Sequence, residues 1–180
     1  MSNSKTEEVK ILDIGCGRNK TTGAIGIDKS SATQADIIHD LNKFPYPFNN
    51  DEFDMVICND VLEHLEDVVA VIEEIHRISK PNAIVRIRIP HFTDSNAYSD
   101  VTHKHFFSRQ SFDCFINNAS KYKYYTKSRF KILNVRISFR RLYRRTGIEY
   151  FANLWPEIYE RYFAFIFPAG NIEFELMVLK

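Results

Sequence analysis

The first ninety residues alternate short apolar runs with polar turns, and this alternation constrains the fold more than any other feature of the chain. Each run is short enough to be a strand that is buried on both faces of a parallel sheet. The runs are residues 9–15, 23–28, 35–41, 53–60 and 83–90. Between the last two, residues 66–81 show helical spacing of apolar residues, with Asp67 as a candidate N-cap and Pro81 at the end. These βαβ units predict a Rossmann-like, doubly wound, mostly parallel sheet.

The second half of the chain predicts a different arrangement. Residues 91–108 are polar and aromatic with little periodicity, so we expect a functional loop there. After it we expect a short helix near 109–119, a strand in 130–143, a helix in 148–167 broken at Pro156, and a final strand in 171–180. The complete sheet is then predicted to have about seven strands, with an antiparallel C-terminal strand, in one domain spanning residues 1–180.

Composition sets limits on location and partners. The three cysteines are odd in number and lie at no metal or redox spacing, which favours a reducing, cytoplasmic compartment. No signal-peptide pattern opens the chain, and no apolar run reaches membrane-spanning length. The net charge of +1 hides an asymmetry: residues 1–113 hold 12 Lys+Arg and 18 Asp+Glu, whereas residues 114–180 hold 12 and 5.

The glycine turn after the first run predicts a bound cofactor, because ligands of such sheets lie beyond the carboxyl ends of the strands. A dinucleotide fingerprint needs a third glycine, but Lys20 stands at that position here. The fingerprint also has an acidic residue about 20 residues further on, whereas Asp28 comes earlier than that. The segment after Gly17 is also too short for a helix whose N-terminus would bind a pyrophosphate. A cofactor without phosphates, whose ribose hydroxyls bind a carboxylate, fits this turn better.

Five motifs in this order resemble those of class I S-adenosylmethionine-dependent methyltransferases, close to the type 11 group. They are LDIGCG, GIDKS, the long segment DLNKFPYPFNNDEFDMVICNDVLEHLED, which spans two of them, and RISKP, and the resemblance runs from about Val9 to Pro90. It implies S-adenosyl-L-methionine as the cofactor. It also implies a binding set in which Asp28 binds the ribose hydroxyls, Asp40 and Leu41 flank the adenine, and the methionine part lies against Asp13, Gly15, Cys16, Gly17 and Asn59.

The chain departs from the family pattern in its helices. The helix after the glycine turn is missing or reduced to one turn, and only about eight residues precede the first strand. In the fifth run, Arg86 and Arg88 point to one face of the sheet. Because two buried, unpaired guanidinium groups would be very costly, we predict that no local apolar helix seals this face. The face is then open to water at the sheet edge, covered by 148–167 with Glu149, Glu157 or Glu160 as partners, or covered by a second subunit.

The acceptor is expected to bind against the loop that follows the fifth strand, so residues 91–129 are interpreted as an acceptor-side insertion. A hydroxyl acceptor needs a base, and we expect His103 or His105 in this role, oriented by Asp100 or Asp94. The equal alternative is that this segment is the polar start of a helix whose Phe106 and Phe107 pack into the core. A divalent metal bound by His103 and His105, together with His91 and a carboxylate, is a less favoured alternative, so no metal is predicted.

The sequence therefore predicts an S-adenosylmethionine-dependent methyltransferase that acts by O- or N-methylation on a polar or anionic small acceptor, such as a sugar. The alternative is a non-catalytic binding protein with a vestigial cofactor pocket. Its basic residues 121–145, with ten Lys+Arg and interleaved aromatic residues, would grip nucleic acid or a membrane surface. Nucleic acid is not favoured, because no nucleic-acid module is recognisable, and a homodimer is a further expectation.

Overall fold

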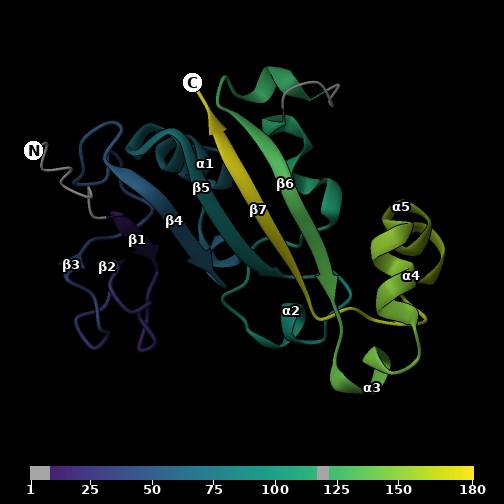
Figure 1. Cartoon of the computed structure of the whole chain (residues 1–180). Coiled ribbons are helices and arrows are strands. Elements are labelled where there is room, and N and C mark those ends of the chain that lie inside the picture. The colour runs from purple at the N-terminus through teal and green to yellow at the C-terminus, as the bar shows by residue number, and fades with distance from the viewer. Residues whose placement is uncertain (1–8, 117–121) are drawn as a thin grey trace, which may run out of the picture.

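The computed structural model describes residues 9–116 and 122–180. Seven strands form one sheet in the order β3-β2-β1-β4-β5-β7-β6 (Figure 1). They are β1 (Ile11–Ile14), β2 (Ile25–Asp28), β3 (Ile37–Ile38), β4 (Phe53–Asn59), β5 (Ser79–Pro90), β6 (Arg129–Ser138) and β7 (Asn171–Leu179). The first five strands pair in parallel, and β7 is antiparallel to both of its neighbours. The predicted mostly parallel sheet with an antiparallel C-terminal strand is thus confirmed.

The helices are few and short. The α-helices are α1 (Val68–Ile78), α2 (Asn96–Ser99), α3 (Arg141–Arg144), α4 (Ile148–Leu154) and α5 (Pro156–Ile158). Three 3-10 helices are η1 (Leu62–His64), η2 (Arg109–Phe115) and η3 (Lys123–Tyr125), and one π-helix is η4 (Tyr159–Phe163). The expected break at Pro156 is present. The expected helix near 109–119 is a 3-10 helix that ends at Phe115, and its last three positions lie outside the described residues.

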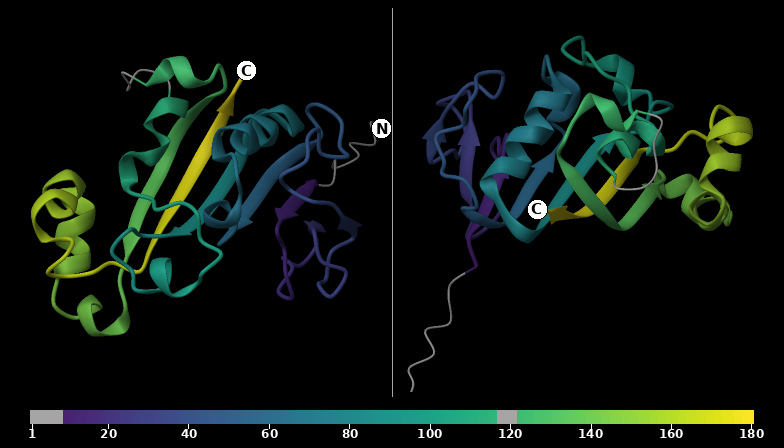
Figure 2. Two further views of the ribbon diagram at one scale, coloured as in Figure 1. Left: turned by 180° about the vertical axis from the view of Figure 1, so that it is seen from behind. Right: turned by 90° about the horizontal axis from the view of Figure 1, so that it is seen from above.

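One face of the sheet carries the main core. The N-cap Asp67 accepts a hydrogen bond from the Ala70 N–H at 2.9 Å and starts α1, whose Ile72 and Ile75 are buried. On the same face, Phe112 of η2 packs against Phe174 of β7 with ring centroids 4.4 Å apart. A second, smaller cluster lies around Tyr159, where α4 and η4 pack beside the end of β6 (Figure 2).

The opposite face is bare over the four strands β4, β5, β7 and β6: no helix of the described ranges covers it (Figure 1). The glycine turn explains part of this, because residues 15–24 form turns and no helix, as expected from the sequence. The helix that would precede β1 falls on residues 1–8, which are outside the described ranges. Among the described residues, no helix is both long and apolar enough to span a membrane.

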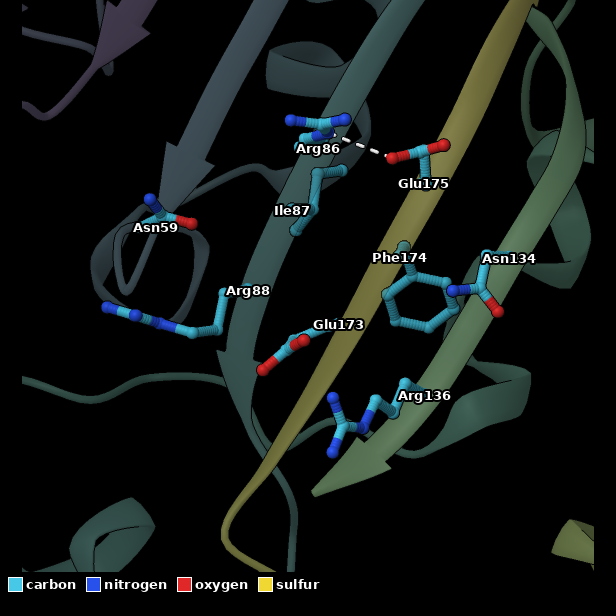
Figure 3. Close-up of a pocket in the computed structure, with 9 residues that line it drawn as sticks. All are labelled: Asn59, Arg86, Ile87, Arg88, Asn134, Arg136, Glu173, Phe174 and Glu175. Atoms are coloured by element: carbon cyan, nitrogen blue, oxygen red, sulfur yellow. Dashed lines mark hydrogen bonds and ion pairs between the residues drawn. The ribbon is translucent and has the colours of Figure 1, made fainter. Parts of the chain in front are cut away.

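The bare face is polar where the two arginines of β5 lie, as Figure 3 shows. Arg86 donates from Nε to the Oε2 atom of Glu175 at 2.9 Å, and Arg88 pairs with Asp60. The first pair follows from the register, since Arg86 lies directly opposite Glu175 in the antiparallel pairing of β5 with β7. Within residues 9–116 and 122–180 no apolar helix seals this face, as predicted. Of the partners expected from 148–167, Glu149 pairs with Arg136 instead.

Candidate functional site

The turn after β1 is shaped by two glycines with left-handed backbones. Gly15 has a φ of 62°, and a Cβ atom at this position would lie 2.4 Å from Cγ2 of Val61, which follows β4. Only glycine fits there without displacing Val61. The N–H of Gly17 donates to Oδ2 of Asp28 at 3.0 Å, and the N–H of Ser30 donates to the other oxygen, Oδ1, at 2.9 Å. Asp28 therefore ties the turn to the end of β2.

A cavity of about 520 Å³ opens at this turn. Four predicted cofactor residues line it, namely Gly15, Asp28, Asp40 and Leu41. The rest of its wall is Lys29, Asn42, Asp60, Val61, His64, Leu65, Val101, Thr102 and Lys104. A lining that combines carboxylates, among them Asp28, with the aliphatic side chains of Leu41, Val61 and Leu65 suits a ribose joined to a flat apolar base.

Other predicted cofactor residues have different positions. Asp13 is buried and accepts from the Thr21 N–H at 2.7 Å, so it holds the turn from below. Cys16 is buried, and its Sγ would be 2.8 Å from a Cβ atom at Gly26. Asn59 does not join the cavity, because its side chain lies on the bare face in the groove of Figure 3. Its register partner is Arg88, which points to the same side of the sheet.

A second cavity, of about 610 Å³, adjoins the first and shares Asp60 and His64 with it. Its lining is mostly polar and comes from the segment after β4, which includes η1, from the end of β5 and the loop that follows it, and from the start of β7. The remaining lining residues are Glu63, Arg88, Pro90, Asn96, Ser99, Asp100, His103 and Asn171. His103 and Asp100 therefore lie where the acceptor was expected, next to the cofactor cavity.

The loop after β5 is anchored on the segment that follows β4. The Lys104 N–H donates to the Glu63 carbonyl at 2.7 Å, and Nε2 of His105 lies 2.9 Å from the Leu65 carbonyl oxygen. The His105 ring is thereby committed to the backbone and lines neither cavity. Phe107 is buried in the core, as the packing alternative expected, whereas Phe106 is exposed and stacks on Tyr98.

Of the two candidate orienting carboxylates, Asp100 is the one near His103. Its Oδ2 atom lies 4.0 Å from Nε2 of His103. Oδ1 of Asp100 accepts from both the N–H and the hydroxyl of Thr102, at 2.8 and 2.7 Å. These hydrogen bonds lower the pKa of Asp100. Asp94 is instead buried in a pair with Arg140 at 2.6 Å.

The sequence interpretation missed Glu63, which directly precedes His64 in η1. Its side chain is buried, and within the described part of the chain neither carboxylate oxygen has a hydrogen-bond partner. Burial without such a partner raises its pKa to about 7. The signal available in the sequence was a Glu-His pair just after the fourth predicted strand, where site residues gather. Of the three histidines considered for a metal, only His103 is near this carboxylate, since His91 is buried beside Thr93.

The basic stretch 121–145 is partly used inside the molecule. Arg129 donates to backbone carbonyls of Thr126 and Ser128, and Arg140 binds Asp94. Arg136 pairs with Glu149. Lys121 and the side chain of Arg144 lie outside the described part of the structure. Several of the cations that would track a phosphate backbone are thus engaged in stabilising the C-terminal part of the fold.

Comparison with known proteins adds a family and a fold. A family model described as a methyltransferase domain matches residues 12–87. A SAM-dependent methyltransferase from Archaeoglobus fulgidus has a TM-score of 0.63 at 16% identity, over 94% of this chain and 86% of that chain. One from Mesorhizobium loti has a TM-score of 0.60 at 15% identity, over 94% and 90%. The sequence matches no curated protein.

A third solved structure was determined with a ligand. Phosphoethanolamine N-methyltransferase 2 from Haemonchus contortus, in complex with S-adenosyl-L-methionine, has a TM-score of 0.57 at 15% identity. The match covers 95% of this chain and 48% of that chain. At these identities the solved structures show the fold, and the family model matches the segment 12–87, which holds the glycine turn.

Proposed function

We propose that the chain is a class I S-adenosylmethionine-dependent methyltransferase and that it methylates an oxygen or nitrogen of a small polar acceptor, such as a sugar, bound in the cavity around His103. The observation that carries this proposal is the meeting of the two cavities at Asp60 and His64. A methyl donor in the first cavity would face an acceptor in the second across these residues.

The lining of the second cavity favours a hydroxyl-rich acceptor. It combines carboxylates, the amides of Asn96 and Asn171, the hydroxyl of Ser99 and the guanidinium of Arg88. Such a set of donors and acceptors fits the hydroxyls of a sugar better than an apolar group. Arg88 adds a positive charge that would suit an anionic form, although its pairing with Asp60 offsets it.

Methyl transfer from a sulfonium is an in-line displacement, so the site must first align the acceptor atom, the methyl carbon and the sulfur. A hydroxyl acceptor must also lose its proton to a base as it attacks. A neutral amine can attack without a base, because its nitrogen already has a free lone pair. We assign the acceptor-side role to His103, which lines the cavity beside Asp100. His105 then has a positioning role, because its ring fastens the loop to the Leu65 carbonyl.

The test is turnover with a panel of acceptors. The purified protein is incubated with S-adenosylmethionine and monosaccharides, sugar nucleotides, nucleotides or phospholipid headgroups, and formation of S-adenosylhomocysteine is measured. Turnover with a hydroxyl-rich acceptor is expected, and His103→Ala should reduce it by about 10²–10⁴-fold. His76→Ala is the matched control, since His76 lies far from both cavities and hydrogen-bonds to Leu179.

Two results would contradict the proposal. Unchanged turnover in His103→Ala would remove this residue from the acceptor side. No turnover with any acceptor, together with tight binding of RNA or anionic vesicles, would favour the alternative of a non-catalytic binding protein. Affinity for S-adenosylhomocysteine, measured by calorimetry, should be equal in the wild type and His103→Ala, which shows that the variant is folded.

A further inference from the structure

Three potential metal ligands meet where the two cavities join. Glu63, His64 and His103 each offer one ligand atom, and these atoms all lie within 4.8 Å of one another. Glu63 and His64 come from η1, whereas His103 comes from the loop after β5, forty positions later in the chain. The two imidazole rings are edge-on to each other with centroids 4.6 Å apart. This cluster is therefore assembled by the tertiary fold and not by a local turn.

Hydrogen bonds leave one nitrogen lone pair available on each histidine. The Thr102 hydroxyl donates to Oδ1 of Asp100 at 2.7 Å, so its oxygen must accept the hydrogen bond from Nδ1 of His64 at 2.8 Å. Nδ1 of His103 lies 3.1 Å from the carbonyl oxygen of Ala97, which can only accept. Both rings therefore carry hydrogen on Nδ1, and in the neutral imidazole the lone pair is on Nε2.

The carboxylate of Glu63 supplies an independent observation. Glu63 has 1% of its surface exposed and lines the second cavity, yet neither oxygen has a hydrogen-bond partner among the described residues. Burying a carboxylate without a partner costs several kcal/mol unless a charge compensates it. A cation bound by the Glu63 carboxylate and by one ring nitrogen of each histidine would provide that compensation.

We infer that Glu63, His64 and His103 bind a divalent transition-metal ion that holds a hydroxyl oxygen of the acceptor. Two imidazoles and one carboxylate form a ligand set that suits such ions and leaves coordination positions open for a substrate. The bonds from Nδ1 of His64 to Thr102 and from Nδ1 of His103 to Ala97 are the second-sphere contacts that fix a ligating ring and its tautomer. This inference rests on the proposed function for the identity of the bound hydroxyl.

The position of the cluster gives the ion a chemical role. His64 lines both cavities, so an ion bound to it lies at their boundary. In this arrangement His103 acts on the acceptor as a ligand of the ion and does not itself accept the proton. An acceptor hydroxyl coordinated there has a lowered pKa and releases its proton to solvent. The resulting oxygen forms a bond to the methyl carbon while the carbon–sulfur bond breaks, and the electron pair goes to sulfur. The products are the methyl ether, neutral S-adenosylhomocysteine and one proton.

The site can be tested by metal binding without an acceptor. Protein stripped with a chelator and dialysed is titrated with Mn²⁺, and free Mn²⁺ is followed by electron paramagnetic resonance. One ion per chain is expected to bind, and Glu63→Gln and His103→Gln should each weaken binding by more than about 10-fold, because removing a ligand costs at least as much as removing a second-sphere contact. Thr102→Val should weaken it by about 10-fold by releasing the His64 ring.

Matched controls separate the site from general surface binding. Glu66→Gln alters an exposed carboxylate three residues from Glu63, and His76→Gln alters a histidine at the far end of α1. Both should bind Mn²⁺ as the wild type does. Equal affinity in Glu63→Gln and the wild type, or no bound ion in the wild type, would overturn the inference.

Calorimetry with S-adenosylhomocysteine distinguishes failure of the metal site from failure of the proposed methyltransferase function. Glu63 and His103 do not line the cofactor cavity, so both glutamine variants should keep their affinity for this ligand. If turnover persists in the presence of excess chelator while the cofactor binds normally, the methyltransferase stands and the metal site does not. If the ion binds but no acceptor is methylated, the proposed acceptor class is wrong and the site itself remains.

Discussion

One carboxylate beside each of the two adjoining cavities shows a contrast between them: Asp28 on the cofactor side and Glu63 on the acceptor side. On the cofactor side, both oxygens of Asp28 accept backbone N–H groups, and Oδ1 of Asp40 accepts the N–H of Asn42. On the acceptor side, both oxygens of the buried Glu63 have no hydrogen-bond partner among the described residues. On the cofactor side, the carboxylates are thus already hydrogen-bonded to backbone N–H groups of their own loops before any ligand binds. The acceptor side retains an unfavourable group, which is typical of a site whose partner comes from outside the chain.

Backbone geometry on the cofactor side should give the largest effect. Gly15→Ala places a Cβ atom 2.4 Å from Val61 and forces a non-glycine residue to a φ of 62°. Left-handed strain and overpacking together should lower the free energy of unfolding by about 2–5 kcal/mol, measured by urea denaturation. Gly23→Ala is the control: its φ is 79°, but nothing lies within 4 Å of the added Cβ. It should cost only about 1–2 kcal/mol, and equal losses in both variants would refute the steric argument.

Asp28→Ala should weaken binding of S-adenosylhomocysteine by about 1.5–3 kcal/mol, the usual cost of losing hydrogen bonds to a charged group. The reason is that its carboxylate faces the cofactor cavity and also holds the N–H of Gly17. Isothermal titration calorimetry measures this difference. Asp51→Asn, at an exposed turn outside both cavities, serves as the control. Undiminished affinity in Asp28→Ala would show that this residue does not contact the cofactor.

On the acceptor side, the same contrast predicts that a substitution raises the free energy of unfolding instead of lowering it. In metal-free protein, Glu63→Met replaces an unpartnered buried carboxylate with an apolar side chain of similar volume. It should raise the free energy of unfolding by about 1–3 kcal/mol, because such replacements remove a desolvation cost. The same change at the exposed Glu66 should stay within about 0.5 kcal/mol. A loss of stability in Glu63→Met would mean that the Glu63 carboxylate has hydrogen-bond partners, as the carboxylate of Asp28 does.

The smallest effect concerns Glu74, a carboxylate of α1 that lines neither cavity. Burial opposes ionisation of Glu74, but hydrogen bonds from Arg77 and from the Tyr46 N–H outweigh it and lower its pKa. A lowered folded pKa contributes stability above the unfolded pKa of about 4.3, and this stability is lost as pH falls through the folded value. Glu74→Gln should therefore cost about 0.5–1 kcal/mol at pH 7. This cost should vanish in unfolding curves recorded in strong acid.

Much of the fold could be predicted because its signals are local. The apolar runs, the capped helix at Asp67 and the break at Pro156 are all encoded within one element, and each was expected at nearly its observed place. Three elements differ in extent. Residues 35–41 were expected as a strand, but only Ile37–Ile38 pair with β2. The strand expected in 130–143 ends at Ser138 and is followed by α3, and α1 ends at Ile78, so that Pro81 lies in β5 and not at the end of the helix. A run of apolar residues indicates that a strand can form, whereas its length depends on the neighbour that offers hydrogen bonds.

The candidate site divides in the same way. Gly15 and Asp28 could be found from the sequence, because a strand that ends in a glycine turn fixes which residues lie at the edge of the sheet. The side of the sheet on which Asn59 lies depends on register, and a shift of one residue reverses it. The state of Glu63 could not be predicted at all. Whether a buried carboxylate has a partner depends on which segments the fold brings around it. Here these segments include a loop forty residues further along the chain. The Lys104 N–H of that loop donates to the Glu63 carbonyl, and its His103 ring lies near the Glu63 carboxylate.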